Sequence, residues 1–392
     1  MLAASEIYIK SPRTKQRFMP ILRANLETAV AAAAPEAAVL RHGNQQFDIT
    51  AEDLEAAAAA AATVFGIDRV DRVNNLFFTD LADLATKVSR LAKPRISGKT
   101  FAVRVKRNGK HSWKSHDAEV ALGNALFDSS AGVDLSAPNV TVRVSVEGSR
   151  AAVASATWPG PSGLPVGTQA RCLVMLSGGI DSPVAAWMML RRGCPIEIVH
   201  FQLECNQADH ALAVGHLLAE RWGHGADIQL HVLDFEPIKK ELRAAIHPRL
   251  RQVLLKQLMT RAAHRVAAAR QIELVVSGDS LGQVSSQTAA NLIEIDRYAQ
   301  KPLLRPLLAL TKQEIVDRAR TIGTYELSTR AREVCDMSEG QPVEIAAPTR
   351  QLEQGMRQLR DGLLDDAIAT WESVPAAEWV PGVPLTPATT QI

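Results

Sequence analysis

A short polar segment, Ser177-Gly178-Gly179-Ile180-Asp181-Ser182, joins an apolar run to a predicted helix. Two glycines let the backbone bend around an anion, two serine hydroxyls add donors, and a helix N-terminus supplies unpaired N–H groups. The segment therefore predicts a phosphate-binding loop. It matches neither GxxxxGK[ST] nor GxGxxG, which disfavours a kinase-like or a dinucleotide site. A structural turn with no ligand uses the same residue types, so that reading stays open.

Asp181 occupies the place where a P-loop would have its lysine. A carboxylate beside phosphates is repulsive unless a cation lies between them. The sequence therefore predicts that Mg²⁺ bridges Asp181 to the bound phosphates.

The elements that position this loop alternate between apolar strands and helices. The strands are almost continuously apolar, as in a parallel sheet that is covered on both faces. We therefore predict a doubly wound α/β domain, with its ligand site beyond the carboxyl ends of the strands. The expected elements are strands at 172–176, 196–201 and 228–235 and helices at 182–192 and 208–222.

Two smaller α+β blocks precede this domain. The first is predicted to have a strand at Glu6–Lys10, a helix at 15–33, a hairpin around His42–Gln45 and a helix at 51–62 started by Thr50 with Asp53. The second block has predicted strands at 101–106, 140–147 and 151–157 and helices at 80–92 and 116–127. Prolines and glycines at 159–165 indicate a domain boundary.

The second block has a local excess of positive charge. Residues 90–116 contain nine Lys or Arg and no Asp or Glu, although the whole chain has a formal charge of only +2. In the strand at 101–106, Phe101 and Val103 fall on one face while Arg104 and Lys106 fall on the other. The block is typical of a surface that binds a polyanion, although a solvated charged face would look the same. The candidate contacts are Lys99, Arg104, Lys106, Arg107 and Lys110.

The composition restricts the class of protein. The 392 residues are 46% hydrophobic and 22% charged, and they contain no apolar run long enough to cross a bilayer. The four cysteines are scattered, and the N-terminus lacks the apolar region of a secretion signal. We therefore expect a cytoplasmic, reduced protein without a membrane span. After residue 350 a helical pattern continues to about Ser373, and the proline-containing tail that follows is expected to end in disorder.

The segment SGGIDS after an apolar strand resembles the PP-loop of the N-type ATP pyrophosphatases, which cleave ATP between its α and β phosphates. Two further segments, SGDSLGQVSSQT at 277–288 and LRPL at 304–307, resemble the tRNA 4-thiouridine synthetases (tRNA sulfurtransferases). The resemblance covers about residues 5–345. It implies a ferredoxin-like domain at 1–63, a THUMP RNA-binding domain at 64–165, a PP-loop domain at 170–350 and a C-terminal helix and tail at 351–392.

The resemblance also implies which residues bind ATP. Adenine contacts fall on Met175, Leu176, His200 and Phe201, although His200 could equally be a satisfied core histidine. Lys312 matches a lysine near the reacting phosphates, with a surface lysine as the alternative. The implied ATP-binding residues are Met175, Leu176, Ser177, Gly178, Gly179, Ser182, His200, Phe201, Lys256, Gly278 and Gln287.

The sulfur step requires a thiol. Cys335 follows basic residues in a polar stretch, which favours a thiolate, and it matches the family's cysteine in this domain. Cys172 and Cys194 lie where small buried residues are usual. Cys205 could pair with Cys335, but the segment around it departs from the family pattern. No rhodanese-like domain is recognised after residue 350, so the sulfur is expected from a cysteine desulfurase or another persulfide donor.

The resemblance implies that the protein adenylates O4 of uridine 8 in tRNA and replaces that oxygen with sulfur, giving 4-thiouridine. It also implies a link to sulfur transfer for the thiamine thiazole and admits a homodimer. Two alternatives stay open at this point: an ATP pyrophosphatase that acts on a small molecule, and an RNA-binding protein with a degenerate site.

Overall fold

The computed structural model describes residues 2–3, 5–42, 46–204, 208–330, 337, 339–383 and 385–387. They form two compact units, and the helix α2 (Pro12–Ala33) runs from one into the other. The first unit comprises Met1–Ser5, Val30–Ala62 and Ile67–Gly160, and the second comprises Glu6–Ala29, Thr63–Gly66 and Pro161–Ile392. The predicted division into four domains stays a prediction.

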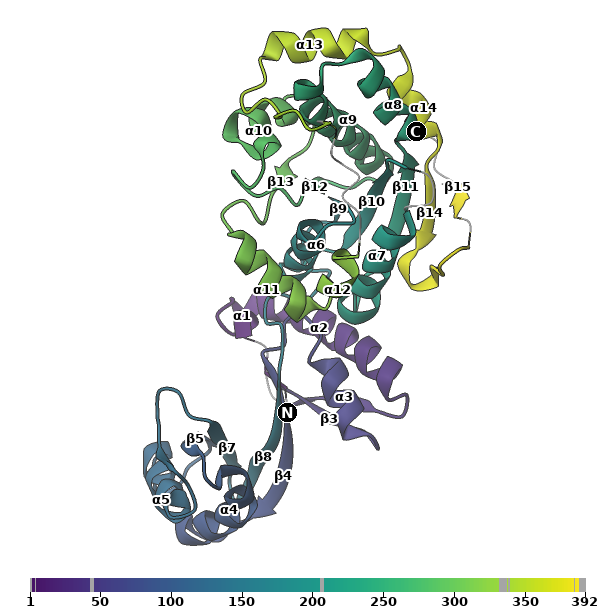
Figure 1. Cartoon of the computed structure of the whole chain (residues 1–392). Helices are drawn as coiled ribbons and strands as arrows, with labels where there is room; N and C mark the ends of the chain where they lie inside the picture. Colours follow the sequence, from purple (N-terminus) through teal and green to yellow (C-terminus); the bar gives the residue numbers. More distant parts are fainter. Residues whose placement is uncertain are drawn as a thin grey trace. The chain divides into compact units, whose positions relative to one another are not determined.

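The first unit is built on one eight-stranded sheet with the order β2-β3-β1-β4-β8-β7-β5-β6. Helices α4 and α5 pack together beside its strands β5, β7 and β8 (Figure 1). The strands are β1 (Leu2–Ala3), β2 (Ala38–His42), β3 (Gln46–Thr50), β4 (Arg69–Phe77), β5 (Thr100–Asn108), β6 (Gly132–Val133), β7 (Val140–Glu147) and β8 (Arg150–Pro159). The helices are α3 (Leu54–Ala61), α4 (Leu81–Ile96) and α5 (Ser115–Phe127).

The alternation predicted for β5 is confirmed. Phe101, Val103 and Val105 are buried in a core with residues of α4 and α5, whereas Arg104 and Lys106 are exposed. The hairpin near His42–Gln45 is also confirmed, because β2 and β3 pair antiparallel from Ala38↔Thr50 to His42↔Gln46.

Two N-terminal predictions were wrong. Residues 5–8 form a short helix, α1 (Ser5–Tyr8), instead of the start of a strand at Glu6–Lys10. Ile7 is fully buried but Ile9 is 80% exposed, so these two residues do not share the single buried face that a strand would give them. The helix α3 starts after Asp53, whose Oδ1 accepts hydrogen bonds from the N–H groups of Glu55 and Ala56, whereas Thr50 ends β3.

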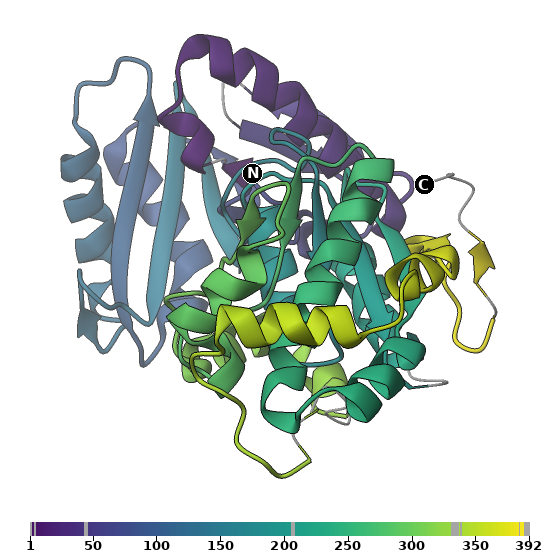
Figure 2. The ribbon, with the colours of Figure 1, turned by 90° about the horizontal axis from the view of Figure 1, so that it is seen from above.

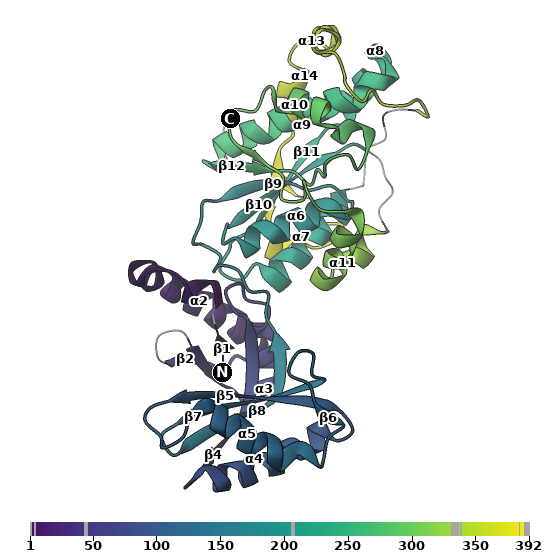
Figure 3. The same ribbon diagram turned by 90° about the vertical axis from the view of Figure 1, so that its left-hand side faces the viewer.

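The second unit contains the predicted doubly wound sheet, in the order β13-β12-β9-β10-β11-β14-β15. The five strands from β13 to β11 are parallel to one another. Figure 3 shows α6 and α7 on one face and α9 and α10 on the other. The strands are β9 (Cys172–Met175), β10 (Ile196–Gln202), β11 (Gln229–Asp234), β12 (Leu274–Val276), β13 (Leu303–Leu304), β14 (Glu372–Pro375) and β15 (Thr386–Pro387).

Alternate residues of the parallel strands enter two separate cores. Leu173 and Val275 pack with α8 and α9, while Val174 and Val276 pack with α6 and α7. The helices of this unit are α6 (Asp181–Arg191), α7 (Ala208–Trp222), α8 (Glu236–Ala245), α9 (Pro248–Ala269), α10 (Ala289–Asp296), α11 (Lys312–Ile322), α12 (Tyr325–Ser328), α13 (Thr349–Gln358) and α14 (Leu363–Ala369). None of the helices in the described part of the chain is long and apolar enough to cross a membrane.

The C-terminal segment adds to this sheet. The predicted single helix after residue 350 is two helices, and α13, the yellow-green helix of Figure 2, packs on α9. β14 then pairs antiparallel with β11, from Val232↔Glu372 to Gln229↔Pro375. Ala376 and Trp379 are buried in the core on the α6–α7 face, so the first part of the proline-containing tail is ordered. The last residues of the tail, where disorder is expected, lie outside the described residues.

An ion cluster lies near the amino ends of β10 and β11. Glu197 has no exposed surface, and its carboxylate contacts His231 Nε2 at 2.9 Å, Arg270 Nε at 2.9 Å and Arg171 at 2.8 Å. Burial favours the neutral acid, but the hydrogen bonds from His231 and Arg270 lower the pKa of Glu197 to about 2. Glu197 is therefore a buried carboxylate that its basic partners keep ionised.

Candidate active site

A cavity of about 960 Å³ lies at the carboxyl ends of β9, β10 and β12 in the second unit. Residues of the loop after β9, of helix α9 and of the segment 277–287 line it. The structure brings to this cavity every predicted ATP-binding residue together with Asp181 and Lys312. They are Met175, Leu176, Ser177, Gly178, Gly179, Ser182, His200, Phe201, Lys256, Gly278 and Gln287.

The loop after β9 is held by its own serines. Ser182 Oγ accepts from the Ser177 N–H at 2.9 Å and lies 3.0 Å from Ser177 Oγ, which also accepts from the Gly179 N–H at 3.3 Å. Helix α6 starts at Asp181, so its free N–H groups belong to this loop. The predicted anion-binding geometry is thus present at a helix N-terminus.

Gly278 allows the second wall of the cavity to approach the loop. A Cβ atom at this position would lie 2.8 Å from both the backbone N and the Cα of Ser182. No larger residue fits unless the loop or the segment 277–287 moves.

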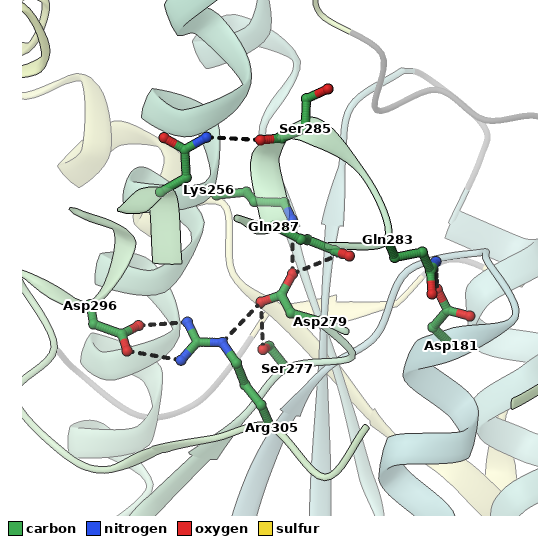
Figure 4. Close-up of polar contacts among 10 residues, drawn as sticks. Asp181, Lys256, Ser277, Asp279, Gln283, Ser285, Gln287, Asp296 and Arg305 are labelled. Carbon is green, nitrogen blue, oxygen red and sulfur yellow. Dashed lines mark hydrogen bonds and ion pairs between the residues drawn. The ribbon is translucent and has the colours of Figure 1, made fainter. Parts of the chain in front are cut away.

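Asp181 is held by two residues far away in the sequence, Lys312 and Gln283, and Figure 4 shows the contact with Gln283. Its Oδ1 lies 2.7 Å from Lys312 Nζ, and its Oδ2 accepts from Gln283 Nε2 at 2.7 Å. Lys312 is the first residue of α11, whose start is fixed by a capping box between Thr311 and Glu314. Both carboxylate oxygens of Asp181 therefore already have donors.

Asp279 is the centre of a second polar network, to which Lys256 and Gln287 converge in Figure 4. Its Oδ1 accepts from Lys256 Nζ at 2.8 Å and from Gln287 Nε2 at 3.2 Å. Its Oδ2 accepts from Ser277 Oγ at 2.7 Å and from Arg305 Nε at 3.4 Å. Burial opposes the charge of Asp279, but the positive charge and hydrogen bond of Lys256 lower its pKa to about 2.

Arg305 joins this network to helix α10. Its two terminal nitrogens bind the carboxylate of Asp296 at 2.8 and 2.6 Å, in the bidentate geometry typical of arginine. The segment LRPL therefore supports the cavity through Arg305.

His200 is a satisfied histidine that also lies at the cavity, and its predicted contact with adenine stays a prediction. Its Nδ1 lies 2.9 Å from the carbonyl oxygen of Leu176, as in a satisfied core histidine, and the residue also lines the cavity. Burial lowers its pKa, so the ring is neutral at pH 7.

Sequence reasoning did not single out five residues of this site: His210, Gln283, Asp279, Asp296 and Arg305. Asp279, Gln283 and Arg305 lie in the two segments that carry the family resemblance, which was the available signal. His210 hydrogen-bonds the backbone of Gly178, while burial lowers the pKa of the ring. Its position near the start of α7 gave no signal for this contact.

The fit of Mg²⁺ depends on Asp181. No cluster of three or more His, Cys, Asp or Glu that could hold a metal ion occurs among the residues that the structure describes. Mg²⁺ commonly binds through one or two carboxylates together with substrate phosphates, so Asp181 alone is a suitable protein ligand. Binding would require Lys312 or Gln283 to release an oxygen of Asp181.

The candidate thiols fall into two groups. Cys172 and Cys194 are buried, and their side chains are hydrogen-bonded to each other, as expected for structural residues. That hydrogen bond and burial raise the pKa of Cys172. Cys335 and Cys205 lie outside the described residues, whereas Arg330, just before the Cys335 segment, lines the cavity.

The basic candidates lie on the first unit. Lys99, Arg104, Lys106 and Lys110 are exposed and Arg107 is half-buried. The guanidinium of Arg104 donates to the carbonyl oxygens of Val103 at 3.1 Å and Leu135 at 2.9 Å. Arg104 is also paired in register with Arg143 of β7, which places two cationic residues side by side.

Two family models match the chain. Residues 167–359 match the model described as thiamine biosynthesis protein (ThiI), and residues 78–155 match the THUMP domain. The first match includes the whole cavity lining, and the second includes the five basic candidates.

Known proteins are similar over nearly the whole chain. A probable tRNA sulfurtransferase of Aeropyrum pernix is 36% identical over 361 residues, 91% of each chain. The tRNA sulfurtransferase of Escherichia coli (strain K12 / DH10B) is 34% identical over 381 residues, which cover 95% of this chain and 78% of that protein. A crystal structure of a 4-thiouridine synthetase–RNA complex with bound ATP matches with a TM-score of 0.77 and 25% identity, covering 95% of this chain and 98% of that one.

Proposed function

Because the chain belongs to the tRNA sulfurtransferase family, we propose that it uses ATP to convert uridine 8 of tRNA into 4-thiouridine. The carbonyl oxygen O4 of the uridine attacks the α-phosphorus, the bond to the β-phosphate breaks, and pyrophosphate leaves. The outer sulfur of a persulfide then attacks C4, and AMP leaves. The S–S bond between that sulfur and its carrier cysteine is cleaved by a second thiol, which forms a disulfide with the carrier, or by an external reductant, and 4-thiouridine is released. The observation that supports this proposal best is the convergence of all the predicted ATP-binding residues, with Asp181 and Lys312, on one cavity.

The loop Ser177–Ser182 binds the phosphates in this proposal, and the start of α6 offers them N–H groups and the positive end of its dipole. Lys256 and Lys312 line the same cavity, and each is already paired with a carboxylate. ATP binding therefore includes an exchange in which lysine ammonium groups turn from Asp279 or Asp181 toward phosphate oxygens. Charge on the leaving pyrophosphate would be stabilised in the same way.

Asp181 is our proposed protein ligand for Mg²⁺. When bound, the ion would neutralise phosphate charge and orient the α-phosphate. Asp181 would hold it next to the loop, and Lys312, once released, would be free to contact a phosphate.

The tRNA is proposed to contact the basic residues of the first unit. A THUMP domain match and exposed cations on β5 support this assignment. The small-molecule alternative would leave this surface without a role, and the paired Asp181 and Lys312 argue against a degenerate site.

The thiol that we propose to carry the sulfur is Cys335. A cysteine desulfurase or another persulfide donor would supply this sulfur. In single turnover, Cys335→Ser is expected to release pyrophosphate and accumulate adenylated tRNA without 4-thiouridine, because an alcohol cannot transfer sulfur. Cys194→Ser is the control, since Cys194 is a buried structural thiol. Full product from Cys335→Ser would refute its role.

Cys205→Ser tests how the persulfide carrier is regenerated. Loss of turnover in this variant would indicate an internal disulfide between Cys205 and Cys335. Retained turnover would indicate an external reductant, and this is the route that we favour.

Mass spectrometry of tRNA nucleosides tests the function directly. Cells that lack this chain are expected to lose 4-thiouridine and to regain it with the wild-type chain but not with Asp181→Asn. Unchanged 4-thiouridine in the deletion strain would refute the function. Growth of the deletion strain without added thiazole would test the proposed thiamine link. Cell fractionation would test the proposed cytoplasmic location, and analytical sedimentation of the purified protein would test the proposed homodimer.

A further inference from the structure

The chain between position 335 and α13 is anchored at many points, although its described part contains neither helix nor strand. We call this part, Met337 and residues 339–347, the connector. Met337 is fully buried in the core with residues of α8 and α9, and its N–H donates to Gln252 Oε1 at 3.3 Å. Gln252 is a residue of α9 that also lines the nucleotide cavity. The connector therefore begins at a fixed point beside the cavity.

Arg251, the neighbour of Gln252 on α9, holds the connector by its charge. Arg251 is only 7% exposed, and two carbonyl oxygens orient its guanidinium: Ile246 O accepts from Nε at 2.7 Å and Arg243 O accepts from Nη2 at 2.8 Å. The remaining nitrogen, Nη1, lies 3.0 Å from Glu339 Oε2. Arg243 Nε forms a second ion pair with Glu339 Oε1 at 3.5 Å. Two guanidinium groups thus share one carboxylate of the connector.

Glu339 has a backbone conformation that needs such support. Its φ is +50°, in the left-handed region that residues other than glycine rarely adopt. A conformation of this kind persists where the surrounding contacts determine it. The ion pairs with Arg251 and Arg243 are such contacts, so breaking them should release the backbone at Glu339.

The far end of the connector is held as firmly. Glu344 Oε2 lies 2.9 Å from Arg249 Nη2, and the Glu344 N–H donates to the carbonyl oxygen of Arg249 at 3.0 Å. Asn291 of α10 donates from Nδ2 to the carbonyl oxygen of Glu344 at 2.7 Å and accepts at Oδ1 from the Ala347 N–H at 3.0 Å. Val343, just before these anchors, lines the nucleotide cavity. The connector is therefore part of the cavity wall and is fixed at both ends.

Helix α9 joins the connector to the nucleotide site. Arg249, Arg251 and Gln252 lie in its first two turns, and Lys256, one turn further, lines the cavity. Residues along the whole length of α9 are buried in the core, so the helix is a rigid base for both. The contacts of the connector thus fix it relative to the residues proposed to bind ATP.

We propose that Arg251 and Glu339 are positioning residues for the transfer of sulfur, because their ion pair fixes the connector that follows the proposed carrier thiol. The proposal rests on the proposed function and on Cys335 as the carrier, and it adds residues that act on the second step of the reaction. Cys335 precedes Met337 by two positions, and two residues span at most about 7 Å. An anchored Met337 therefore limits the distance over which the thiol can act. The described residues that line the cavity do not include Arg251 or Glu339, so adenylation should not depend on the pair.

Glu339→Lys tests the proposal in single turnover. The side chain of Glu339 is 51% exposed, and lysine has a similar backbone preference, so the variant changes the charge and keeps the fold. The protein is charged with inorganic polysulfide, so that no donor protein has to dock, and is then mixed with ATP and tRNA. Pyrophosphate release measures adenylation. Dithiothreitol stops the reaction at each time point and releases the tRNA, and mass spectrometry of its nucleosides measures 4-thiouridine.

Glu339→Lys is expected to release pyrophosphate within about 2-fold of the wild-type rate and to form 4-thiouridine at least about 10-fold more slowly, because a misplaced reacting group slows the step that uses it. The double variant Arg243→Glu with Glu339→Lys restores an opposite charge beside position 339 and should recover most of the lost rate. Asp366→Lys is the matched control, since Asp366 is also an exposed acid paired with an arginine, Arg360, at 2.7 Å, but lies on α14. This control is expected to leave both steps unchanged.

Three results would overturn the proposal. Formation of 4-thiouridine at the wild-type rate by Glu339→Lys would show that the ion pair is not needed. An equal loss of rate in both steps would show that the pair supports the whole unit instead of sulfur transfer. A double variant that recovers nothing would show that the charge of the pair is not what acts. A wild-type protein that forms no 4-thiouridine under these conditions is a different result, and it would refute the proposed function itself.

Discussion

Lys312 and Asp181, 131 positions apart in the sequence, meet at 2.7 Å at the mouth of the phosphate loop. Each is the first residue of its helix, α11 and α6 respectively, so the ion pair joins two helix N-termini. Two positive dipole ends repel, and the carboxylate of Asp181 between them offsets that repulsion. The pair therefore has a structural role before any nucleotide arrives.

Asp181→Asn is expected to lower pyrophosphate release at least about 100-fold, because the variant loses the charge that pairs with Lys312 and that would bind Mg²⁺. Its tRNA affinity is expected to stay unchanged, since Asp181 lies in the nucleotide cavity. Asp317→Asn, an exposed aspartate on α11, is the control. Pyrophosphate release at the wild-type rate would rule out the assigned role.

Gly278→Ala is expected to abolish ATP binding, because the added Cβ would displace the backbone at Ser182, 2.8 Å away. The ATP affinity of the variant is measured by isothermal titration calorimetry. Gly123→Ala is the control, because a Cβ atom added at this position in the middle of α5 would meet no other part of the protein within 4 Å. This variant is expected to stabilise the protein by about 1 kcal/mol. Normal affinity in Gly278→Ala would show that the loop tolerates displacement.

Neutralising Lys99, Lys106, Arg107 and Lys110 is expected to weaken tRNA binding while leaving ATP affinity intact. Each lost phosphate contact should lower the slope of log affinity against log salt by about 0.7–0.9. Arg357→Ala, an exposed cation on α13, is the control for a change in net charge. If the variant binds tRNA as tightly as the wild type at moderate salt, this basic block is only a solvated surface.

Glu197→Gln is expected to lower the free energy of unfolding at pH 7 by about 3 kcal/mol, because the fold holds the pKa of Glu197 near 2 against an ordinary 4.5. A lowered pKa stabilises the fold above pH 4.5, and that contribution is lost as the pH falls toward 2. The difference in unfolding free energy between the variant and the wild type, measured by urea titrations, should therefore shrink as the pH falls over this range. Glu27→Gln, an exposed partner of Arg23, is expected to cost less than about 0.5 kcal/mol at any pH. A difference in unfolding free energy that does not change with pH would refute the view that Glu197 is a buried, ionised carboxylate.

The sequence predicted the local parts of the site well. The loop 177–182, its flanking strand and helix, and the alternation along β5 are encoded in consecutive residues, so pattern and spacing were enough. The predicted ATP-binding residues, from four separate segments, came from the family resemblance. The fold brings them to one cavity because the carboxyl ends of parallel strands share one edge.

Other features depend on contacts between distant residues and could not be predicted from the chain alone. Gln283 reaches Asp181 across 102 positions, and nothing in either segment signals that pair. The strand β14 includes Pro375 and follows a helical pattern, so only its pairing with β11 defines it. The helix α1 was mistaken for a strand because two isoleucines at alternate positions imitate a strand in so short a segment.

The balance of charge in the nucleotide cavity has a consequence for competition by free anions. Among the residues that the structure describes, three carboxylates, Asp181, Asp209 and Asp279, line it together with three cations, Lys256, Lys312 and Arg330. A small anion such as inorganic phosphate gains no net attraction from these charged side chains, and it must break an ion pair before it can contact a lysine. A nucleotide can offset the same cost with its base and sugar contacts. Millimolar phosphate in the surrounding medium should therefore be a poor inhibitor, and pyrophosphate, once cut from its nucleoside, should leave readily.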